Sequence, residues 1–161
     1  PDWERPKGRD RMQGYVGQIE QLTEEDRNFR SVLFTARHMQ LVLMALKPRE
    51  EIGSEVHTTH DQFFRIEKGK GEVRMTGAKI KVAAGDAIIV PAGTQHNLIN
   101  TGKRRLRLYT LYTPPNHAAG LVEATRVLAD AHELARQTDP TTGPSRKPSN
   151  SEGLPATSVA Q

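Results

Sequence analysis

The stretch that most constrains the fold is the run from Gly85 to Asn100, where an apolar strand pattern ends in a rigid turn. Residues 87–90 are uninterruptedly apolar, and Pro91 ends the run because proline cannot donate to a sheet ladder. His96 follows in a second strand, with Leu98 and Asn100 on its own face. The turn therefore places the imidazole of His96 on one face of a sheet. If the sheet closes into a β-barrel, a side chain in this position can act as a metal ligand at the open end of the barrel.

The rest of the chain repeats short strand patterns separated by turn residues. They recur every eight to twelve residues, which predicts an all-β barrel or sandwich. Residues 39–46 form a nearly continuous apolar run, as expected of a strand buried on both sides. The predicted strands cover residues 30–34, 39–46, 63–66, 72–75, 80–82, 87–90, 98–99 and 106–112.

The run after Gly85 resembles the second motif of the cupin superfamily. In that motif, five residues separate a glycine from a proline, and one residue separates the proline from a second glycine. Two residues then precede a histidine, and three more precede an asparagine. Gly85, Pro91, Gly93, His96 and Asn100 fill every fixed position. The resemblance implies a double-stranded β-helix, related to the jelly roll, over roughly residues 30–113. An N-terminal arm and a short C-terminal helix would flank it.

The first cupin motif, expected about 30 residues upstream, is altered. When it is anchored on Gly69, Gln62 takes the position of the family's glutamate and His57 that of its second histidine. Glu55 takes the position of the first histidine, and Arg49 replaces the opening glycine. The resemblance implies a divalent metal ion, zinc, iron, manganese, nickel or cobalt, held by nitrogen and oxygen ligands. The implied ligands are Glu55, His57, Gln62 and His96.

Each of these residues also has a plainer interpretation. Glu55 lies two residues from His57, so both side chains point to one side of a strand. Glu55 could instead belong to a solvent-exposed row of acidic residues, or it could act as a general base that does not bind the metal. Gln62 could be an amide that orders water rather than a ligand. His60 is expected in a loop, on the face opposite His57. Three further histidines are expected at the surface: His38, His117 and His132. Met44, Phe64, Leu108 and Tyr112 could line a cavity or simply pack the core.

The predicted organisation has four parts. Residues 1–30 are expected to form an arm, with a short strand at 15–19 as one interpretation and a helix starting at Thr23. Residues 31–113 are expected to form the cupin barrel, and residues 114–137 a helical segment. Residues 138–161 form a tail that is expected to be disordered. The helix is predicted from apolar residues at three- and four-residue steps, namely Leu121, Ala124, Leu128, Ala131 and Ala135.

The composition of the chain limits the kinds of metal site, membrane contact and binding partner that it can have. The chain has no cysteine, which excludes thiolate metal sites, and no apolar run long enough to span a membrane. Residues 31–113 carry 13 basic and seven acidic side chains, densest at residues 103–107. Arg105 and Arg107 alternate with leucines, which favours a solvated strand face over a nucleic-acid site, with attraction of an anionic substrate as the alternative. We expect a cytoplasmic homodimer that binds no nucleic acid.

Two functions are compatible with these residues. The first is a metal-dependent enzyme acting on a small oxygenated molecule by dioxygenase, isomerase or lyase chemistry, with Glu55 as the catalytic residue. The second is a non-catalytic barrel that binds or senses a small molecule, favoured by the altered first motif.

Overall fold

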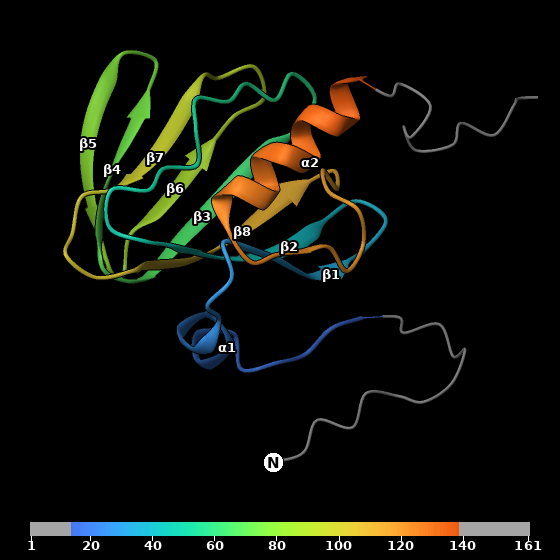
Figure 1. Cartoon of the computed structure of the whole chain (residues 1–161), viewed down its shortest axis with the longest axis horizontal. Helices are drawn as coiled ribbons and strands as arrows, with labels where there is room; N and C mark the ends of the chain where they lie inside the picture. The colour runs from blue at the N-terminus through green and yellow to red at the C-terminus, as the bar shows by residue number, and fades with distance from the viewer. Residues whose placement is uncertain (1–13, 139–161) are drawn as a thin grey trace, which may run out of the picture.

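The computed structural model describes residues 14–138, which fold around one antiparallel β structure (Figure 1). The helices are α1 (Ile19–Glu25) and α2 (Arg126–Thr138). The strands are β1 (Arg30–Thr35), β2 (Gln40–Leu46), β3 (Asp61–Lys68), β4 (Lys70–Met75), β5 (Ala78–Ala83), β6 (Ala87–Val90), β7 (His96–Asn100), β8 (Leu106–Thr113) and β9 (Val122–Glu123). The predicted tail, apart from Thr138 at the end of α2, and the first part of the predicted arm lie outside the described residues.

The strands form two sheets, which confirms the predicted all-β double-stranded β-helix. The larger sheet has the order β6-β3-β8-β2-β1-β9 and the smaller has the order β5-β4-β7. Every strand pair is antiparallel. Each of the eight predicted strands falls on an observed one, because alternation and turn residues are local signals.

The segment between β2 and β3 extends the smaller sheet and positions the candidate site. It pairs with β7 through two isolated bridges, Glu51 with Ile99 and Glu55 with His96. The backbones of Glu55 and His96 exchange two hydrogen bonds, at 2.9 and 3.0 Å. This segment therefore lies beside β7 as a partial strand. The pairing brings the part of the chain that resembles the first cupin motif next to the part that resembles the second.

The core lies between the sheets. In β8, Leu106, Leu108, Thr110 and Tyr112 are buried and alternate with half-buried residues, as expected of a strand with one face on the core. Five consecutive residues of β2, Val42–Leu46, are buried. The second face of β2 is covered because α1 contacts β2, β3 and β8.

The N-terminal helix differs from its prediction. Residues 15–18 form no strand, and α1 begins at Ile19, so Thr23 lies inside the helix and does not cap it. The hydroxyl of Thr23 donates instead to the carbonyl of Ile19 at 2.7 Å. Threonine can satisfy its hydroxyl inside a helix in this way, which is why its capping preference misplaced the start.

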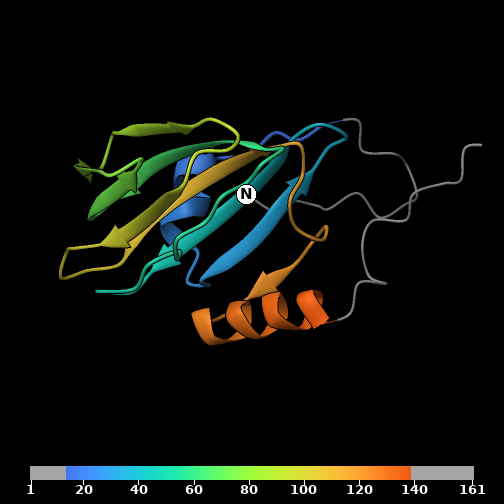
Figure 2. The ribbon, with the colours of Figure 1, turned by 90° about the horizontal axis from the view of Figure 1, so that it is seen from above.

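The C-terminal helix exists but starts later and buries a different face. Leu121 and Ala124 precede α2, and the intervening residues form β9 against β1. Within α2, Ala129 is buried, whereas Leu128 is 46% exposed. Figure 2 shows α2 lying beside β9 at one side of the molecule. Among residues 14–138, neither helix is long and apolar enough to cross a membrane.

A buried ion pair holds this C-terminal segment to the barrel. Arg30 of β1 donates to Glu123 of β9 at 2.6 Å, and both side chains are almost fully buried. His132 of α2 contacts the second carboxylate oxygen of Glu123 at 2.9 Å. The C-terminal segment is therefore joined to β1 through one carboxylate, which no local sequence pattern indicates.

Candidate metal centre

Glu55, His57 and His96 form one cluster at the start of β7. Glu55 is directly opposite His96 in the backbone pairing, so both side chains emerge on the same face. His57 lies two residues further along the connecting segment, and its carbonyl accepts a hydrogen bond from the Gly93 amide at 2.8 Å. The turn at residues 91–93 therefore fixes the backbone of His57 as well as the entry of His96.

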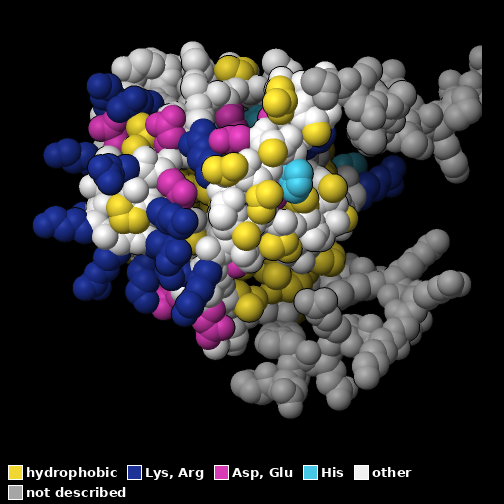
Figure 3. All heavy atoms as spheres, in the orientation of Figure 1, with side chains coloured by type: hydrophobic (Ala, Val, Ile, Leu, Met, Phe, Trp, Pro, Cys, Tyr) yellow, Lys and Arg dark blue, Asp and Glu magenta, His cyan; other side chains and the backbone are white. Residues whose placement is uncertain are grey.

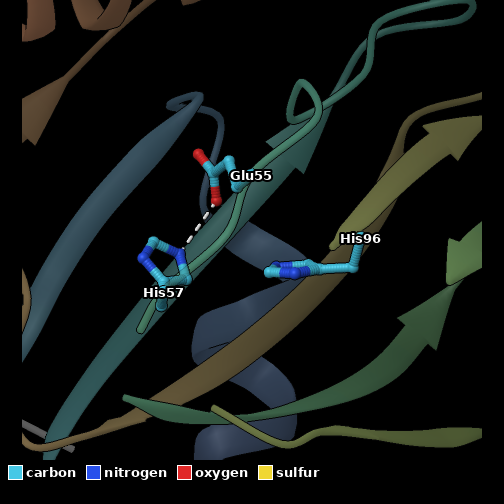
Figure 4. A group of neighbouring side chains, drawn as sticks. All are labelled: Glu55, His57 and His96. Carbon is cyan, nitrogen blue, oxygen red and sulfur yellow. Dashed lines mark hydrogen bonds and ion pairs between the residues drawn. The ribbon is translucent and has the colours of Figure 1, made fainter. Parts of the chain in front are cut away.

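The nitrogen and oxygen atoms of this cluster lie close enough to surround one ion. One ligand atom from each of the three residues lies within 4.8 Å of the other two. His57 Nε2 is 3.1 Å from Glu55 Oε2, and the rings of His57 and His96 are 5.6 Å apart. Figure 4 shows the three side chains pointing toward a common space.

Gln62 of β3 completes the cluster from the opposite sheet. Its side-chain oxygen is 3.1 Å from His96 Nε2, while its amide nitrogen donates to the hydroxyl of Thr110 at 3.0 Å. Gln62 is 2% exposed. Gln62 is therefore held in place by the core and faces the imidazole that the second motif supplies.

The donor set fits a divalent cation. The carbonyl of Thr94 lies 3.0 Å from His96 Nδ1 and can only accept, so neutral His96 keeps its proton there and directs the Nε2 lone pair inward. That lone pair then faces the Gln62 oxygen, which is also an acceptor. Adjacent ligands on one ion, with bonds of about 2.1 Å, lie about 3 Å apart. A cation can thus satisfy both atoms at the distance observed.

Tyr112 of β8 borders the same cluster and is 1% exposed. Its ring lies edge-on to His57, with centroids 5.8 Å apart. Burial raises the pKa of the Tyr112 hydroxyl well above its usual value, and the nearby charge of Glu55 raises it further. Tyr112 therefore keeps its proton at neutral pH and offers a hydrogen-bond donor rather than an anionic ligand.

Two histidines lie nearer the site than predicted. His60 is in a loop as expected, but its ring is 5.9 Å from that of His57 rather than on an opposite face, and its Nε2 lies 3.2 Å from the carbonyl of Pro115. The irregular backbone between residues 56 and 60 breaks the strand alternation on which that prediction relied. His57 itself lies in this irregular segment, not in a regular strand.

His117 is half-buried, whereas the sequence predicts it at the surface. Its ring packs edge-on against Tyr112 at 5.0 Å, and its backbone is held by both ends of the buried Gln40 side chain. Burial, followed by the charge of Arg30, lowers the pKa of His117 to about 3. No motif marks His117 in the sequence, because its place depends on how the chain folds back after β8. His38 is exposed and His132 half-exposed, as predicted.

The chain is similar to a recognised domain family and to several proteins. The model of the Cupin domain matches residues 42–112. The uncharacterized protein YrkC of Bacillus subtilis is 45% identical over 125 residues, which span 74% of this chain and 67% of that protein. An uncharacterized protein of Acanthamoeba polyphaga mimivirus is 40% identical over 119 residues, which span 71% of this chain and 74% of that protein.

A solved structure supports the same relationship. The crystal structure of BH2720 from Bacillus halodurans superposes with a TM-score of 0.72 at 40% sequence identity. The superposition covers 80% of this chain and 96% of that protein. The similarity therefore extends over the fold and beyond the domain itself.

Proposed function

Because the chain belongs to the cupin family, we propose that it binds one divalent metal ion and acts on a small oxygenated organic molecule. The observation that carries this proposal is the group of Glu55, His57 and His96, whose ligand atoms lie within 4.8 Å of one another. Gln62 is the fourth candidate donor. These ligands suit zinc, iron, manganese, nickel or cobalt, and the chain has no cysteine to compete with them.

The protein side chains have separable roles in this proposal. The ion would supply Lewis-acid chemistry for an isomerase or lyase reaction, or oxygen chemistry for a dioxygenase. The Thr94 carbonyl fixes the tautomer of His96. Tyr112, protonated and buried, has its hydroxyl beside the side chain of Gln62 and would help to hold that donor in place. Glu55, 27% exposed in its side chain, can instead accept a proton from substrate if it is not a ligand.

A second candidate is a non-catalytic barrel that binds or senses a small molecule. The observation that favours it is Gln62, which replaces an anionic ligand and whose two polar atoms both face protein groups. Such a site would hold metal weakly. Metal content distinguishes the two candidates, since stoichiometric metal supports the enzyme and its absence from a folded protein supports the binding module.

The test combines metal analysis of the purified chain with calorimetric titration of the metal-free protein by Zn²⁺ and Mn²⁺. We expect one site, weakened by at least about a hundredfold in His57→Ala and in His96→Ala. His38→Ala is the matched control, because His38 is exposed in the β1–β2 turn. If wild type shows no saturable binding, or if His38→Ala weakens it as much, the metal-centre proposal fails.

The homodimer belongs to this proposal as well. β5, β6, β7 and β9 are the edges of the two sheets. The segment between β2 and β3 partly covers β7, whereas β5 and β6 expose the large apolar side chains of Ile80 and Ile89. Open apolar edges need cover, which pairing with a second copy would provide. Light scattering after gel filtration should give twice the chain mass, and a monomer at all concentrations would contradict the dimer.

A further inference from the structure

A hollow of about 730 Å³ lies at the opposite end of β7 from His96. It lies where β2 and β3 end and β8 begins, and none of the candidate metal ligands lines it. We call it the basic hollow, because six basic side chains line it: Lys47, Lys68, Lys103, Arg104, Arg105 and Arg107. Figure 3 shows many Lys and Arg side chains on the left of the view, over the end of the molecule that holds β4 and β5 in Figure 1.

Asn100 holds one wall of the basic hollow in place. It is 1% exposed, and its amide nitrogen donates to the carbonyls of Leu46 at 2.9 Å and Arg104 at 2.8 Å. Its side-chain oxygen accepts from the Gly102 amide at 2.9 Å. One buried side chain thus ties the basic turn after β7 to the end of β2, next to Lys47.

Gly69 brings the second wall close. It has a φ of +96°, and a Cβ at this position would lie 2.9 Å from the carbonyl oxygen of Arg105. The β3–β4 turn can therefore approach the start of β8 only because residue 69 has no side chain. This contact places Lys68 next to the basic turn.

The charges in the basic hollow are largely uncompensated. Among its described lining residues the one carboxylate is Glu24, which pairs with Lys68 at 2.7 Å. Arg107 donates to the backbone carbonyl of Asp26, which carries no net charge. The Nε of Arg105 is buried and, among the described residues, has no hydrogen-bond partner.

The remaining cations are equally unpaired. Within residues 14–138, no carboxylate side chain makes an ion pair with Lys47, Lys103 or Arg104. Gathering like charges in a concave surface raises the local potential and concentrates anions there. The fold therefore holds together cations that repel one another unless an anion joins them.

We propose that the basic hollow binds a small molecule that carries several phosphate charges. Guanidinium groups match phosphate oxygens in paired hydrogen bonds, and lysines add point charges. Among the described residues that line the basic hollow, no aromatic side chain offers a surface on which a nucleic-acid base could stack. A free oligophosphate and the phosphate groups of a larger metabolite share this chemistry.

The test uses inorganic tripolyphosphate as the probe, titrated into the full chain by calorimetry at constant ionic strength. We expect saturable binding that rises in affinity from phosphate to pyrophosphate to tripolyphosphate and exceeds that of citrate. In the double variant Lys103→Glu/Arg104→Glu, affinity should fall by at least about tenfold. Both side chains are exposed, so the variant should fold, as circular dichroism can verify.

Arg37→Glu/Lys79→Glu is the matched control. It changes the net charge equally at exposed residues outside the basic hollow and should bind tripolyphosphate as wild type does. If both double variants lost the same affinity for tripolyphosphate, the loss would come from the change in net charge alone, and the proposal would be overturned. Stronger binding of a single-stranded oligonucleotide would also overturn it, in favour of a nucleic-acid surface.

A further arm separates this inference from the metal centre. Folded His57→Ala/His96→Ala should bind tripolyphosphate unchanged, because neither histidine lines the basic hollow. Loss of binding there would show that the phosphate occupies the metal centre instead, which would overturn the inference. Failure of metal binding in wild type would leave the phosphate titration interpretable.

Discussion

At the scale of single residues, Glu55 is the one anionic group among the four candidate ligands. Two imidazoles and an amide leave a divalent charge poorly compensated in a partly buried site. Glu55→Gln should therefore weaken Zn²⁺ or Mn²⁺ binding by about ten- to a hundredfold, measured by calorimetry. Binding as tight as in wild type would make Glu55 a surface acid and favour the non-catalytic barrel.

Gln62→Glu tests the same charge argument from the other sheet. It restores a carboxylate at the position where the family has one, so metal binding should be retained or strengthened. Without metal, the new carboxylate would be buried next to Thr110, and the melting temperature should fall. Added Zn²⁺ should recover it. A variant that is destabilised equally with and without metal would show that Gln62 has only a packing role.

His117 should make stability depend on pH. Its pKa is about 3 in the folded protein and about 6.5 when unfolded, so below pH 6.5 the unfolded chain binds a proton that the folded chain does not. The free energy of unfolding should fall as pH drops from 6.5 toward 3, by up to about 1.4 kcal/mol per pH unit. Urea denaturation should show a shallower decline in His117→Gln, whereas exposed His38→Gln should keep the wild-type profile.

At the scale of elements, the turns decide how closely strands from different parts of the chain approach. Gly69 and Gly77 both have positive φ, but a Cβ at Gly77 would meet nothing within 4 Å. Gly77→Ala should cost about 1 kcal/mol from backbone strain alone. Gly69→Ala should cost more, roughly 2–4 kcal/mol, because its Cβ also meets the Arg105 carbonyl. Urea denaturation measures the free energy of unfolding of the two variants. Equal losses would contradict the close approach of the β3–β4 turn to the backbone of Arg105.

At the scale of the whole molecule, the candidate metal centre links both sheets. Gln62 belongs to the larger sheet and His96 to the smaller, while Glu55 and His57 come from the segment between β2 and β3. An ion bound there should stabilise the whole barrel by about 2.7 kcal/mol at a hundred times its dissociation constant. Scanning calorimetry should show one transition that shifts upward with Zn²⁺ in wild type and stays fixed in His96→Ala.

The sequence by itself determined the strands, the fold class and the pair of histidines. Period-two alternation, turn glycines and Pro91 are local features, so their spacing predicts the individual strands, and the resemblance to the two cupin motifs is what paired His57 with His96. The same reasoning misjudged the chain ends, where α1 starts before Thr23 and β9 precedes α2. Those boundaries depend on contacts with distant strands, which local propensity does not contain.

Only the tertiary structure decided which groups surround the site and where charge gathers. The direct pairing of Glu55 with His96, the burial of His117 and the basic hollow each join segments far apart in the chain. Sequence reasoning treated the arginines near residue 105 as a solvated face because alternation gives the side of a strand, not its neighbours. Burial and electrostatic potential are sums over all nearby groups, so they become defined only when the fold brings those groups together.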